Sequence, residues 1–416
     1  MSIYQRPSSS LPWPYFLAGA LTAAFLFLLG AVSYRAVTRA HLSPPAPRVP
    51  TRDTAKTNDP SDDLSLYREA WQILEEDFYG EVPSETERNY GAIRGSVETL
   101  QDPYTYFIEP EPAGREEEQL QGRFGGIGAY LELREDGRIR LIPMIDRPAA
   151  LAGIEEGDIL VAVDGEPVPV PANLDDVTAR VRGPVGTVVR ITVERQGQVV
   201  DFEIERQEIE LPSVSWRILD KEAGIGYIRI ERFSALTARE QAQAIQELES
   251  QGMTAALVLD LRGNPGGLLD AAIAVSSQYL DGGPVLIERH ADGSEKLYQA
   301  ETSAVSLPSS VAIAVLVDGG TASAAEILAG ALQDRGRGTL IGARTFGKGS
   351  IQRIHRLSDQ SALHVTFAKW FTPNGHQIDG QGLNPDIPVD EAGEGGEQDP
   401  FLQAALDHLK RETSHE

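Results

Sequence analysis

The second half of the chain alternates short apolar runs with amphipathic segments. Runs such as "TAALVLD" and "SVAIAVLVD" are almost wholly hydrophobic, which is typical of strands that are buried on both faces of a sheet. Segments with helical periodicity follow them, among them "TAREQAQAIQELESQG" and "SAAEILAGALQDR". Buried strands that alternate with helices predict a layered α/β domain, which we place at residues 208–390.

The remaining sequence divides into segments of different character. Residues 116–207 contain short β-rich runs bounded by glycines and interrupted by two helical segments, which predicts a compact α+β module. Residues 62–115 carry apolar positions at helical spacing, which predicts a small helical module. Residues 391–416 contain an acidic, glycine-rich linker and then a short helix. A chain of 416 residues is long enough for several such domains.

The amino terminus is free of charge over a long stretch. No charged residue occurs from Pro7 to Tyr34, and residues 14–34 are long enough to cross a bilayer as a helix. We expect an uncleaved transmembrane signal anchor there, because Trp13 and Tyr34 flank the span as interface residues do. Residues 35–61 are rich in proline and polar residues, which predicts a tether. Arginines lie on both sides of the span, so the charge rule leaves its orientation open.

Composition argues against several kinds of chemistry. The formal net charge of −25 argues against nucleic acid as a partner. The chain has no cysteine, which rules out disulfides, thiolate nucleophiles and cysteine-ligated zinc. No His-Glu-x-x-His zinc signature is present either. We therefore expect a protein that needs no metal and no other cofactor.

Residues 342–350, "GARTFGKGS", place a lysine between two glycines. The pattern Gly-x-x-x-x-Gly-Lys is close to a phosphate-binding loop, in which a serine or threonine and then a helix follow the lysine. Here Gly349 follows Lys348, and the next residues alternate apolar and polar positions as a strand does. Two requirements of a nucleotide site therefore fail, which argues against nucleotide binding.

A second candidate, Ser323, lies where a predicted strand ends and a predicted helix begins. Ser323 and Glu326 have the spacing of a capping box, in which the serine caps the helix. The alternative is catalysis, because a serine at such a junction is exposed. The N–H of Ala324 would then point outward with the helix dipole behind it, as in an oxyanion site. The spacing alone favours capping.

A histidine-based triad has no support in the sequence. None of the seven histidines lies in a recognisable triad motif, and no G-x-S-x-G elbow is present. His355 and His364 fall in predicted strands, where packing or a surface position is the simpler interpretation.

Two long motifs carry a family resemblance. "TASAAEILAGALQD", followed by "TFGKGSIQ", resembles the carboxy-terminal processing proteases, also called tail-specific proteases. The resemblance implies a serine peptidase with Ser323 as nucleophile, assisted by Lys348, while Gln352 matches the family's glutamine. It also implies a layered crotonase/ClpP-like protease core at 208–390 with an inserted PDZ domain at 116–207. The run "VDGGTAS" departs from relatives that carry Asn or Ser near the nucleophile, but no catalytic group is replaced.

The mechanism that the resemblance implies agrees with local physics. The pKa of a free lysine is about 10.4, and burial can lower it by about 3–5 units. A buried Lys348 would therefore be a workable general base for Ser323. We expect positions 348, 350 and 352 to share one face of a strand, which would let Gln352 orient the lysine amine by hydrogen bonding.

The implied oxyanion donors are two backbone N–H groups. One belongs to Ala324, and the other comes from "NPGG", where we prefer Gly266 over Gly267. Without the family match, an ordinary tight turn would be the better interpretation of "NPGG".

The stretch "FGGIGAYLEL" resembles the start of the family's PDZ domain, which implies binding of protein C-termini. In that fold a glycine-rich loop offers N–H groups to the terminal carboxylate, and the peptide adds a strand to the sheet. The candidate binding residues are Gly125, Gly126, Ile127 and Gly128, with Ile127 lining an apolar pocket. For any single glycine, a plain β-turn is the alternative. Arg182 is either a surface charge or a link between the PDZ domain and the protease, and the sequence does not decide between them.

Together these features predict a membrane-anchored serine endopeptidase that cuts proteins or peptides near apolar C-termini. By family analogy its body lies outside the cytoplasm, in the periplasm or cell envelope. The main alternative is a PDZ adaptor that binds peptides on a catalytically idle scaffold. A homodimer formed through the terminal helices is possible, and the sequence leaves the oligomeric state open.

Overall fold

The computed structural model describes residues 64–390 and 399–413. The segments expected to form the membrane anchor and the tether, 14–34 and 35–61, lie outside the described residues, as does most of the acidic linker. The chain divides into two compact units, Met1–Val82 and Pro83–Glu416. In the described part of the first unit, the helix is α2 (Ser65–Asp77), which has no buried residue. None of the described helices combines the length and the apolarity that a bilayer crossing requires.

A six-stranded sheet forms the centre of the second unit, in the order β10-β11-β12-β15-β16-β19. The last five strands are parallel, and β10 is antiparallel at one edge. The strands are β10 (Val214–Asp220), β11 (Ile225–Ile230), β12 (Ala256–Asp260), β15 (Ala312–Val317), β16 (Thr339–Gly342) and β19 (Ile387–Pro388). The continuously apolar runs of the sequence are therefore central strands, as predicted.

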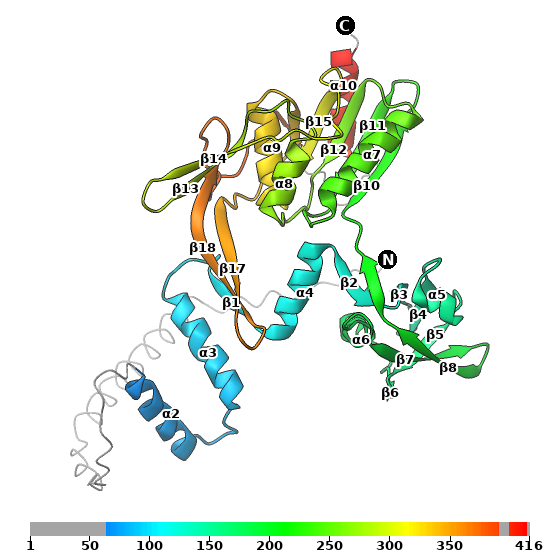
Figure 1. Ribbon diagram of the computed structural model, residues 1–416, viewed down its shortest axis with the longest axis vertical. Helices are drawn as coiled ribbons and strands as arrows, with labels where there is room; N and C mark the ends of the chain where they lie inside the picture. Colours follow the sequence, from blue (N-terminus) through cyan, green and yellow to red (C-terminus); the bar gives the residue numbers. More distant parts are fainter. Residues whose placement is uncertain (1–63, 391–398, 414–416) are drawn as a thin grey trace, which may run out of the picture. The chain divides into compact units, whose positions relative to one another are not determined.

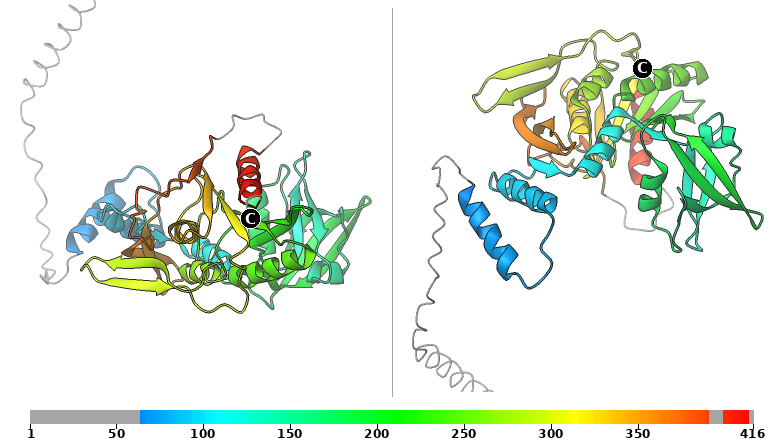
Figure 2. Two further views of the ribbon diagram at one scale, coloured as in Figure 1. Left: turned by 90° about the horizontal axis from the view of Figure 1, so that it is seen from above. Right: turned by 60° about the horizontal axis from the view of Figure 1, so that its bottom comes forward.

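Helices cover both faces of this sheet, which explains why its central strands are apolar throughout. One face packs against three helices and the other against the C-terminal helix, and the two groups lie on opposite sides in Figures 1 and 2. The three helices are α7 (Thr237–Gln251), α8 (Leu269–Ser276) and α9 (Ala324–Asp334). The C-terminal helix, α10 (Pro400–Thr413), buries Phe401, Ala405 and Leu409. This arrangement confirms the predicted layered α/β core.

A second sheet carries the lysine motif. Its order is β1-β18-β13-β14, and β17 pairs with β18. The strands are β1 (Tyr106–Ile108), β13 (Pro284–His290), β14 (Glu295–Gln299), β17 (Ser350–Arg356) and β18 (Ala362–Phe371). The register between β17 and β18 shifts between Ile351 and Gln352, where Phe367 of β18 has no partner. The residues after Lys348 thus form a strand, as the argument against a phosphate loop requires.

An α+β module occupies the middle of the chain and begins and ends in one ribbon. The strand that enters it, β2 (Arg123–Gly126), pairs antiparallel with the strand that leaves it, β9 (Gln207–Glu210). Its sheet has the order β3-β4-β5-β7-β8, and β6 pairs with β5. The elements are β3 (Ala129–Leu133), β4 (Ile139–Pro143), α5 (Pro148–Ala152), β5 (Ile159–Val163), β6 (Glu166–Pro167), α6 (Leu174–Val181), β7 (Val188–Arg195) and β8 (Gln198–Glu205).

Two helices precede this module. The first, α3 (Glu85–Glu98), starts with a capping box in which Ser84 and Glu87 bond each other's backbone N–H. The second, α4 (Pro110–Gln121), was not predicted, and it crosses the boundary that we placed between residues 115 and 116. Its sequence lacks apolar periodicity because only Ala113 is buried. The remaining side chains of α4 are mostly polar, and several of them make the contacts described below.

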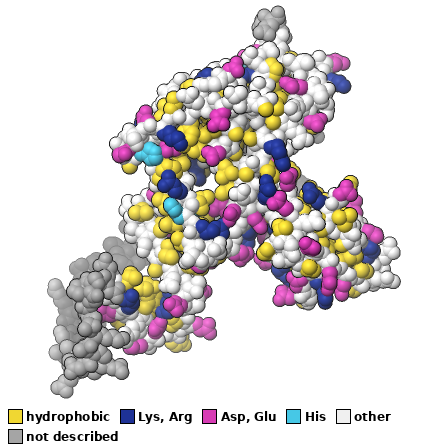
Figure 3. All heavy atoms as spheres, viewed as in Figure 1, with side chains coloured by type: hydrophobic (Ala, Val, Ile, Leu, Met, Phe, Trp, Pro, Cys, Tyr) yellow, Lys and Arg dark blue, Asp and Glu magenta, His cyan; other side chains and the backbone are white. Residues whose placement is uncertain are grey.

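Charges of both signs are mixed over the surface. In the view of Figure 3, acidic side chains are interspersed with arginines and lysines, and apolar side chains gather near the middle of the visible face. On this face, charges of both signs are therefore mixed, although the formal net charge of the chain is −25.

Candidate active site

Ser323 is held in an unusual backbone conformation between β15 and α9. Its φ is 55° and its ψ is −117°, a region that costs a non-glycine residue about 1–3 kcal/mol and is found mostly at functional sites. The neighbouring Ala322 N–H donates to the carbonyl of Asn264 at 2.9 Å, and the Ser323 N–H donates to Glu326 at 2.9 Å. These bonds fix the junction, so the strain is held by its surroundings.

The capping box predicted from spacing is formed mainly through its glutamate. The carboxylate of Glu326 accepts from the Ser323 N–H, but the Ser323 side chain makes no cap hydrogen bond. By contrast, Ser84 at the start of α3 accepts from its N3 amide. The hydroxyl of Ser323 therefore faces the Glu326 N–H in the arrangement of a capping box without forming a hydrogen bond to it.

Glu326 also joins the serine and lysine motifs, a role that the spacing did not reveal. It is completely buried, and each of its two oxygens accepts two hydrogen bonds. Oε2 accepts from the N–H of Ser323 and the N–H of Lys348, while Oε1 accepts from the Thr345 hydroxyl and the Gly347 N–H. Burial raises the pKa of the Glu326 carboxyl, and the four hydrogen bonds act in the opposite direction. One carboxylate thus fixes both backbones.

The backbone around Lys348 is packed too closely for side chains. A Cβ on Gly349 would lie 2.2 Å from the Asp379 N atom, and one on Gly347, whose φ is 92°, would lie 2.9 Å from the Gly382 N atom. The carbonyl of Lys348 accepts a 3.0 Å hydrogen bond from the Trp370 indole N–H. Both glycines are therefore required for the loop to fold against residues 378–382.

The amine of Lys348 lies in a partly apolar environment. The side chain is half-buried, and Nζ lies 5.3 Å from the centroid of the Tyr104 ring. Nζ itself makes no ion pair or hydrogen bond with any described residue. Burial lowers the pKa of Lys348, and the charge of Glu116 opposes this effect. The shift is in the direction that a general base requires.

Gln352 does not orient the amine of Lys348 in this structure. Its amide nitrogen donates to the Ser350 hydroxyl at 2.7 Å and lies 3.4 Å from that of Thr366. Ser350 and Gln352 do share one face of β17, but the strand begins at Ser350. We had placed Lys348 beside Gln352 because alternate residues of a strand share one face. Lys348 lies before the strand begins, so this rule does not apply to Lys348.

The predicted oxyanion donors Ala324, Gly266 and Gly267 line one cavity with Ser323, but the N–H of Gly266, the glycine that we preferred, already has an acceptor. A Cβ on Gly266 would lie 2.8 Å from the Ser323 Cβ, so this loop touches the serine directly. However, the Gly266 N–H donates to the Asn264 side chain at 2.9 Å. The N–H groups of Ala324 and Gly267 have no acceptor within the described parts of the chain. The geometry therefore favours Ala324 and Gly267.

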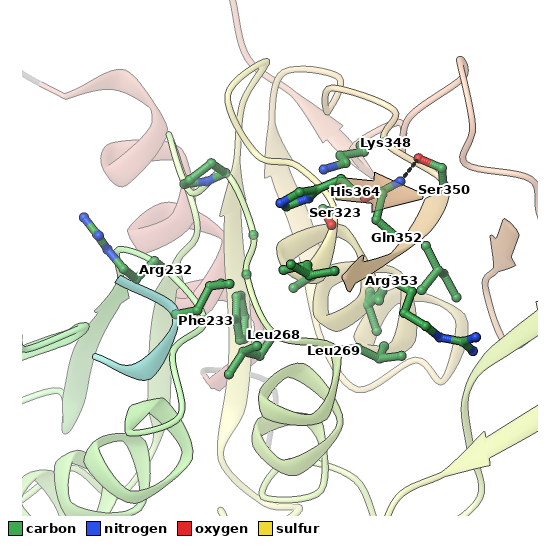
Figure 4. Close-up of a pocket in the computed structure, with 18 of the residues that line it drawn as sticks. Arg232, Phe233, Leu268, Leu269, Ser323, Lys348, Ser350, Gln352, Arg353 and His364 are labelled. Atoms are coloured by element: carbon green, nitrogen blue, oxygen red, sulfur yellow. Dashed lines mark hydrogen bonds between the residues drawn. The ribbon is translucent and has the colours of Figure 1, made fainter. Parts of the chain in front are cut away.

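These groups open into one cavity of 570 Å³. Ser323, Lys348, Gly266 and Gly267 all line it, and Figure 4 shows Ser323 between the lysine and the leucines at the start of α8. Most of the remaining wall is apolar, with Phe233, Leu268, Leu269, Ile327, Ile351, Phe367 and Trp370. The cavity can therefore hold an uncharged chain beside a hydroxyl and an amine.

Two titratable residues of this cavity were missed in the sequence. His364, which we expected to be a packing or surface residue, lies in the wall and is buried. Its Nε2 lies 3.0 Å from the Glu116 carboxylate of α4. No local motif marks Glu116, because α4 itself lacks a helical apolar pattern. Only the fold brings this pair to the cavity.

The predicted PDZ residues have mixed positions. Gly125 and Gly126 belong to β2, and the Gly125 carbonyl accepts from the Gly183 N–H at 3.1 Å. Gly128 has a φ of 71°, which favours glycine. Ile127 is only 2% exposed and packs within the core of the module, so it does not line an open pocket. The sequence analysis placed Ile127 correctly in an apolar environment but not at a surface.

Arg182 links the module to α4. It follows α6, and its guanidinium lies 3.9 Å from the centroid of the Phe124 ring and 3.7 Å from the Glu118 carboxylate. Of the two interpretations of Arg182 that the sequence left open, the contacts favour a link over a free surface charge.

Among the described residues, no cluster of three His, Asp or Glu side chains is arranged to hold a metal.

Comparison with known sequences identifies two matching families. Peptidase family S41 matches residues 224–389, and the PDZ domain family matches residues 144–195. These matches fall in the six-stranded core and in the α+β module, respectively.

Several individual proteins are also similar over most of the chain. A probable CtpA-like serine protease of Staphylococcus aureus (strain bovine RF122 / ET3-1) is 34% identical over 327 residues, 79% of this chain. A protein of the same description from Staphylococcus epidermidis is 34% identical over 319 residues, 77% of this chain. This chain spans 65% and 64% of the lengths of these relatives.

Among solved structures, the photosystem II D1 C-terminal processing protease is 32% identical. The match covers 78% of this chain and 87% of that protein, with a TM-score of 0.45.

The dual role of Glu326 predicts a strong effect of Glu326→Gln. Glutamine has a single acceptor oxygen, so either the Ser323 and Lys348 amides or Thr345 and Gly347 lose their partner. We expect the free energy of unfolding, measured by urea denaturation, to fall by about 2–4 kcal/mol.

Glu87→Gln is the matched control, since Glu87 is the equivalent residue of the exposed capping box of α3. It should lower the free energy of unfolding much less than Glu326→Gln does, because its box is exposed to water. Equal losses in the two variants would contradict the special role of Glu326.

Proposed function

Because this chain belongs to peptidase family S41, we propose that it is a serine endopeptidase with Ser323 as nucleophile and Lys348 as general base. The observation that carries the proposal is the pairing of the two motifs. A strained serine with an uncapped hydroxyl and a half-buried lysine line one cavity, and a single buried carboxylate fixes their backbones. Strain that is held in place at a cavity is typical of functional sites.

In the proposed reaction, the neutral amine of Lys348 accepts the proton of the Ser323 hydroxyl as its oxygen attacks the substrate carbonyl carbon. The N–H groups of Ala324 and Gly267 stabilise the negative charge that develops on the carbonyl oxygen. The Lys348 ammonium then donates its proton to the leaving amine, and an acyl group stays on Ser323. Water, deprotonated by the same lysine, releases the acyl group and regenerates the hydroxyl.

We propose that substrates are proteins or peptides with apolar C-termini, captured by the PDZ domain. The arrangement of the module supports this. β3 is at one end of its sheet, so its outer edge can pair with an added peptide strand, and α6 packs beside β3. If the scaffold were only a peptide-binding adaptor, binding would persist without cleavage.

Substitution of the two proposed catalytic residues tests the reaction. Ser323→Ala and Lys348→Ala should each lower kcat by at least about 10³-fold on an unfolded protein substrate, because each removes a group that acts in the transition state. Lys348→Arg should be equally inactive, since arginine stays protonated.

Lys221→Ala, at an exposed lysine, serves as the control and should retain full activity. Cleavage that persists undiminished in Ser323→Ala would refute the proposal. Peptide binding without turnover by the unaltered protein would favour the adaptor.

The proposed base also predicts the pH dependence of cleavage. Only the neutral amine can accept a proton, so kcat/KM should fall tenfold per pH unit on the acidic side of the pKa of Lys348. Because burial lowers that pKa, the midpoint should lie well below the value of about 10.4 for a free lysine. A pH-rate profile on a neutral substrate measures it, and a midpoint at or above the free-lysine value would exclude a buried base.

We also propose that residues 14–34 anchor the protein in a membrane, with the catalytic body outside the cytoplasm. The support is the uncharged stretch from Pro7 to Tyr34. The full chain should sediment with membranes at high salt and be released by detergent, whereas a chain lacking residues 1–61 should remain in the supernatant. Release of the full chain by salt alone would argue against a spanning anchor.

A further inference from the structure

Two acidic side chains line the catalytic cavity, Glu116 and Asp270. Glu116 comes from α4, and its Oε2 lies 3.0 Å from Nε2 of His364 on β18. The His364 ring is 4% exposed and stacks on Tyr106, with ring centroids 4.5 Å apart and an interplanar angle of 14°. The histidine is fixed by this stacking, and it fixes the carboxylate in turn.

Glu116 is the first of three successive glutamates on α4, each of which pairs with a different part of the protein. Glu117 pairs with Arg356 at the end of β17, and Glu118 pairs with Arg182 of the PDZ module. Of the three, only Glu116 lines the cavity. The helix is therefore held at three points, and one of them places a carboxylate in the wall of the cavity that also contains the proposed base.

The charged and titratable groups around Lys348 come from several elements. The charged and titratable side chains that line the cavity with Lys348 are Glu116 from α4, Tyr106 from β1, Arg232 after β11, Asp270 from α8, Arg353 from β17 and His364 from β18. In addition to these, the Tyr104 ring lies 5.3 Å from Nζ, and Glu326 accepts a hydrogen bond from the Lys348 N–H. The Glu326 carboxylate already accepts four hydrogen bonds, and Asp379 pairs with Lys369 at 2.7 Å. Of the two carboxylates in the cavity wall, Glu116 is the one whose charge opposes the effect of burial on the pKa of Lys348.

We propose that Glu116, held by His364, is a positioning residue that sets how readily Lys348 gives up its proton. This inference rests on the proposed function, in which the neutral amine is the active form. A nearby carboxylate favours the ammonium form, so Glu116 restrains the enzyme at low pH. Because a buried histidine holds it in the wall of the cavity that Lys348 also lines, Glu116 gives the protein control over the acid limit of its activity.

Glu116→Gln in the full chain tests the inference, because glutamine keeps the shape of the side chain and removes its charge. The midpoint of the acid limb of kcat/KM should move to lower pH by about 0.5–1 unit. At pH values below the midpoint, the rate should therefore rise by about 3- to 10-fold. Glu117→Gln is the matched control, since it removes a neighbouring ion pair of the same helix outside the cavity. It should leave the midpoint unchanged.

A titration that does not depend on activity separates this inference from the proposed function. The chain has only six lysines, so the ¹³Cε signal of Lys348 can be followed by NMR in lysine-labelled Ser323→Ala protein and assigned with Lys348→Arg. The pKa of Lys348 should fall in Glu116→Gln and not in Glu117→Gln. An unchanged pKa in Glu116→Gln, or equal shifts in both variants, would overturn the inference even if the enzyme proves to be a peptidase.

The variant Glu116→Asp provides a second test if Glu116→Gln does not fold. It keeps the charge but draws the carboxylate back by one methylene, away from the cavity wall. The Lys348 pKa should then fall by a smaller amount, and a rise would overturn the inference.

Discussion

The buried carboxylate of Glu326 is the group on which the geometry of the candidate active site depends. A charged group without partners would be very costly in such a position, but here four donors from two distant segments converge on it. Its Oε2 accepts hydrogen bonds from the backbones of both Ser323 and Lys348. The same contact that satisfies the carboxylate therefore aligns the two residues that the proposed mechanism requires. The hydrogen bonds that stabilise the buried Glu326 carboxylate are the same ones that hold the backbones of Ser323 and Lys348 in place.

A second constraint is the charge state of Lys348. The chain carries 62 acidic and 37 basic residues, so an exposed lysine would find many carboxylates that favour its ammonium form. The packing of Gly347 and Gly349 against residues 378–382 keeps the lysine backbone within the protein, and its side chain is half-buried in a cavity wall that contains both apolar and charged residues. Glu116, in the same wall, has a charge that raises the pKa of Lys348. Burial and this carboxylate act in opposite directions on the pKa of Lys348, and the proposed mechanism requires that burial prevail.

The sequence predicted the parts of the fold that follow from local pattern. The apolar runs became the central strands, and the strand after Lys348 ruled out a phosphate loop. Two features were missed for physical reasons. Helix α4 buries only Ala113, so its sequence has no apolar periodicity. The second role of Glu326 depends on a loop 19–22 residues away in the sequence. The hydrogen bond that occupies the Gly266 N–H, to the Asn264 side chain, forms only in the folded turn, so the sequence did not indicate that this donor is engaged. Tertiary contacts of this kind produce no periodic pattern in the sequence from which they could be predicted.

The roles proposed for Ser323 and Lys348 require an acyl-enzyme, which can be trapped and identified. An activated ester of a short apolar peptide, mixed with the protein and quenched in acid, should leave its acyl group on one site. The proposed mechanism predicts that mass spectrometry finds the added mass on the peptide that contains Ser323, and that Lys348→Ala abolishes the label. Acylation at another residue, or turnover of the ester with no covalent adduct under any quenching time, would contradict the account.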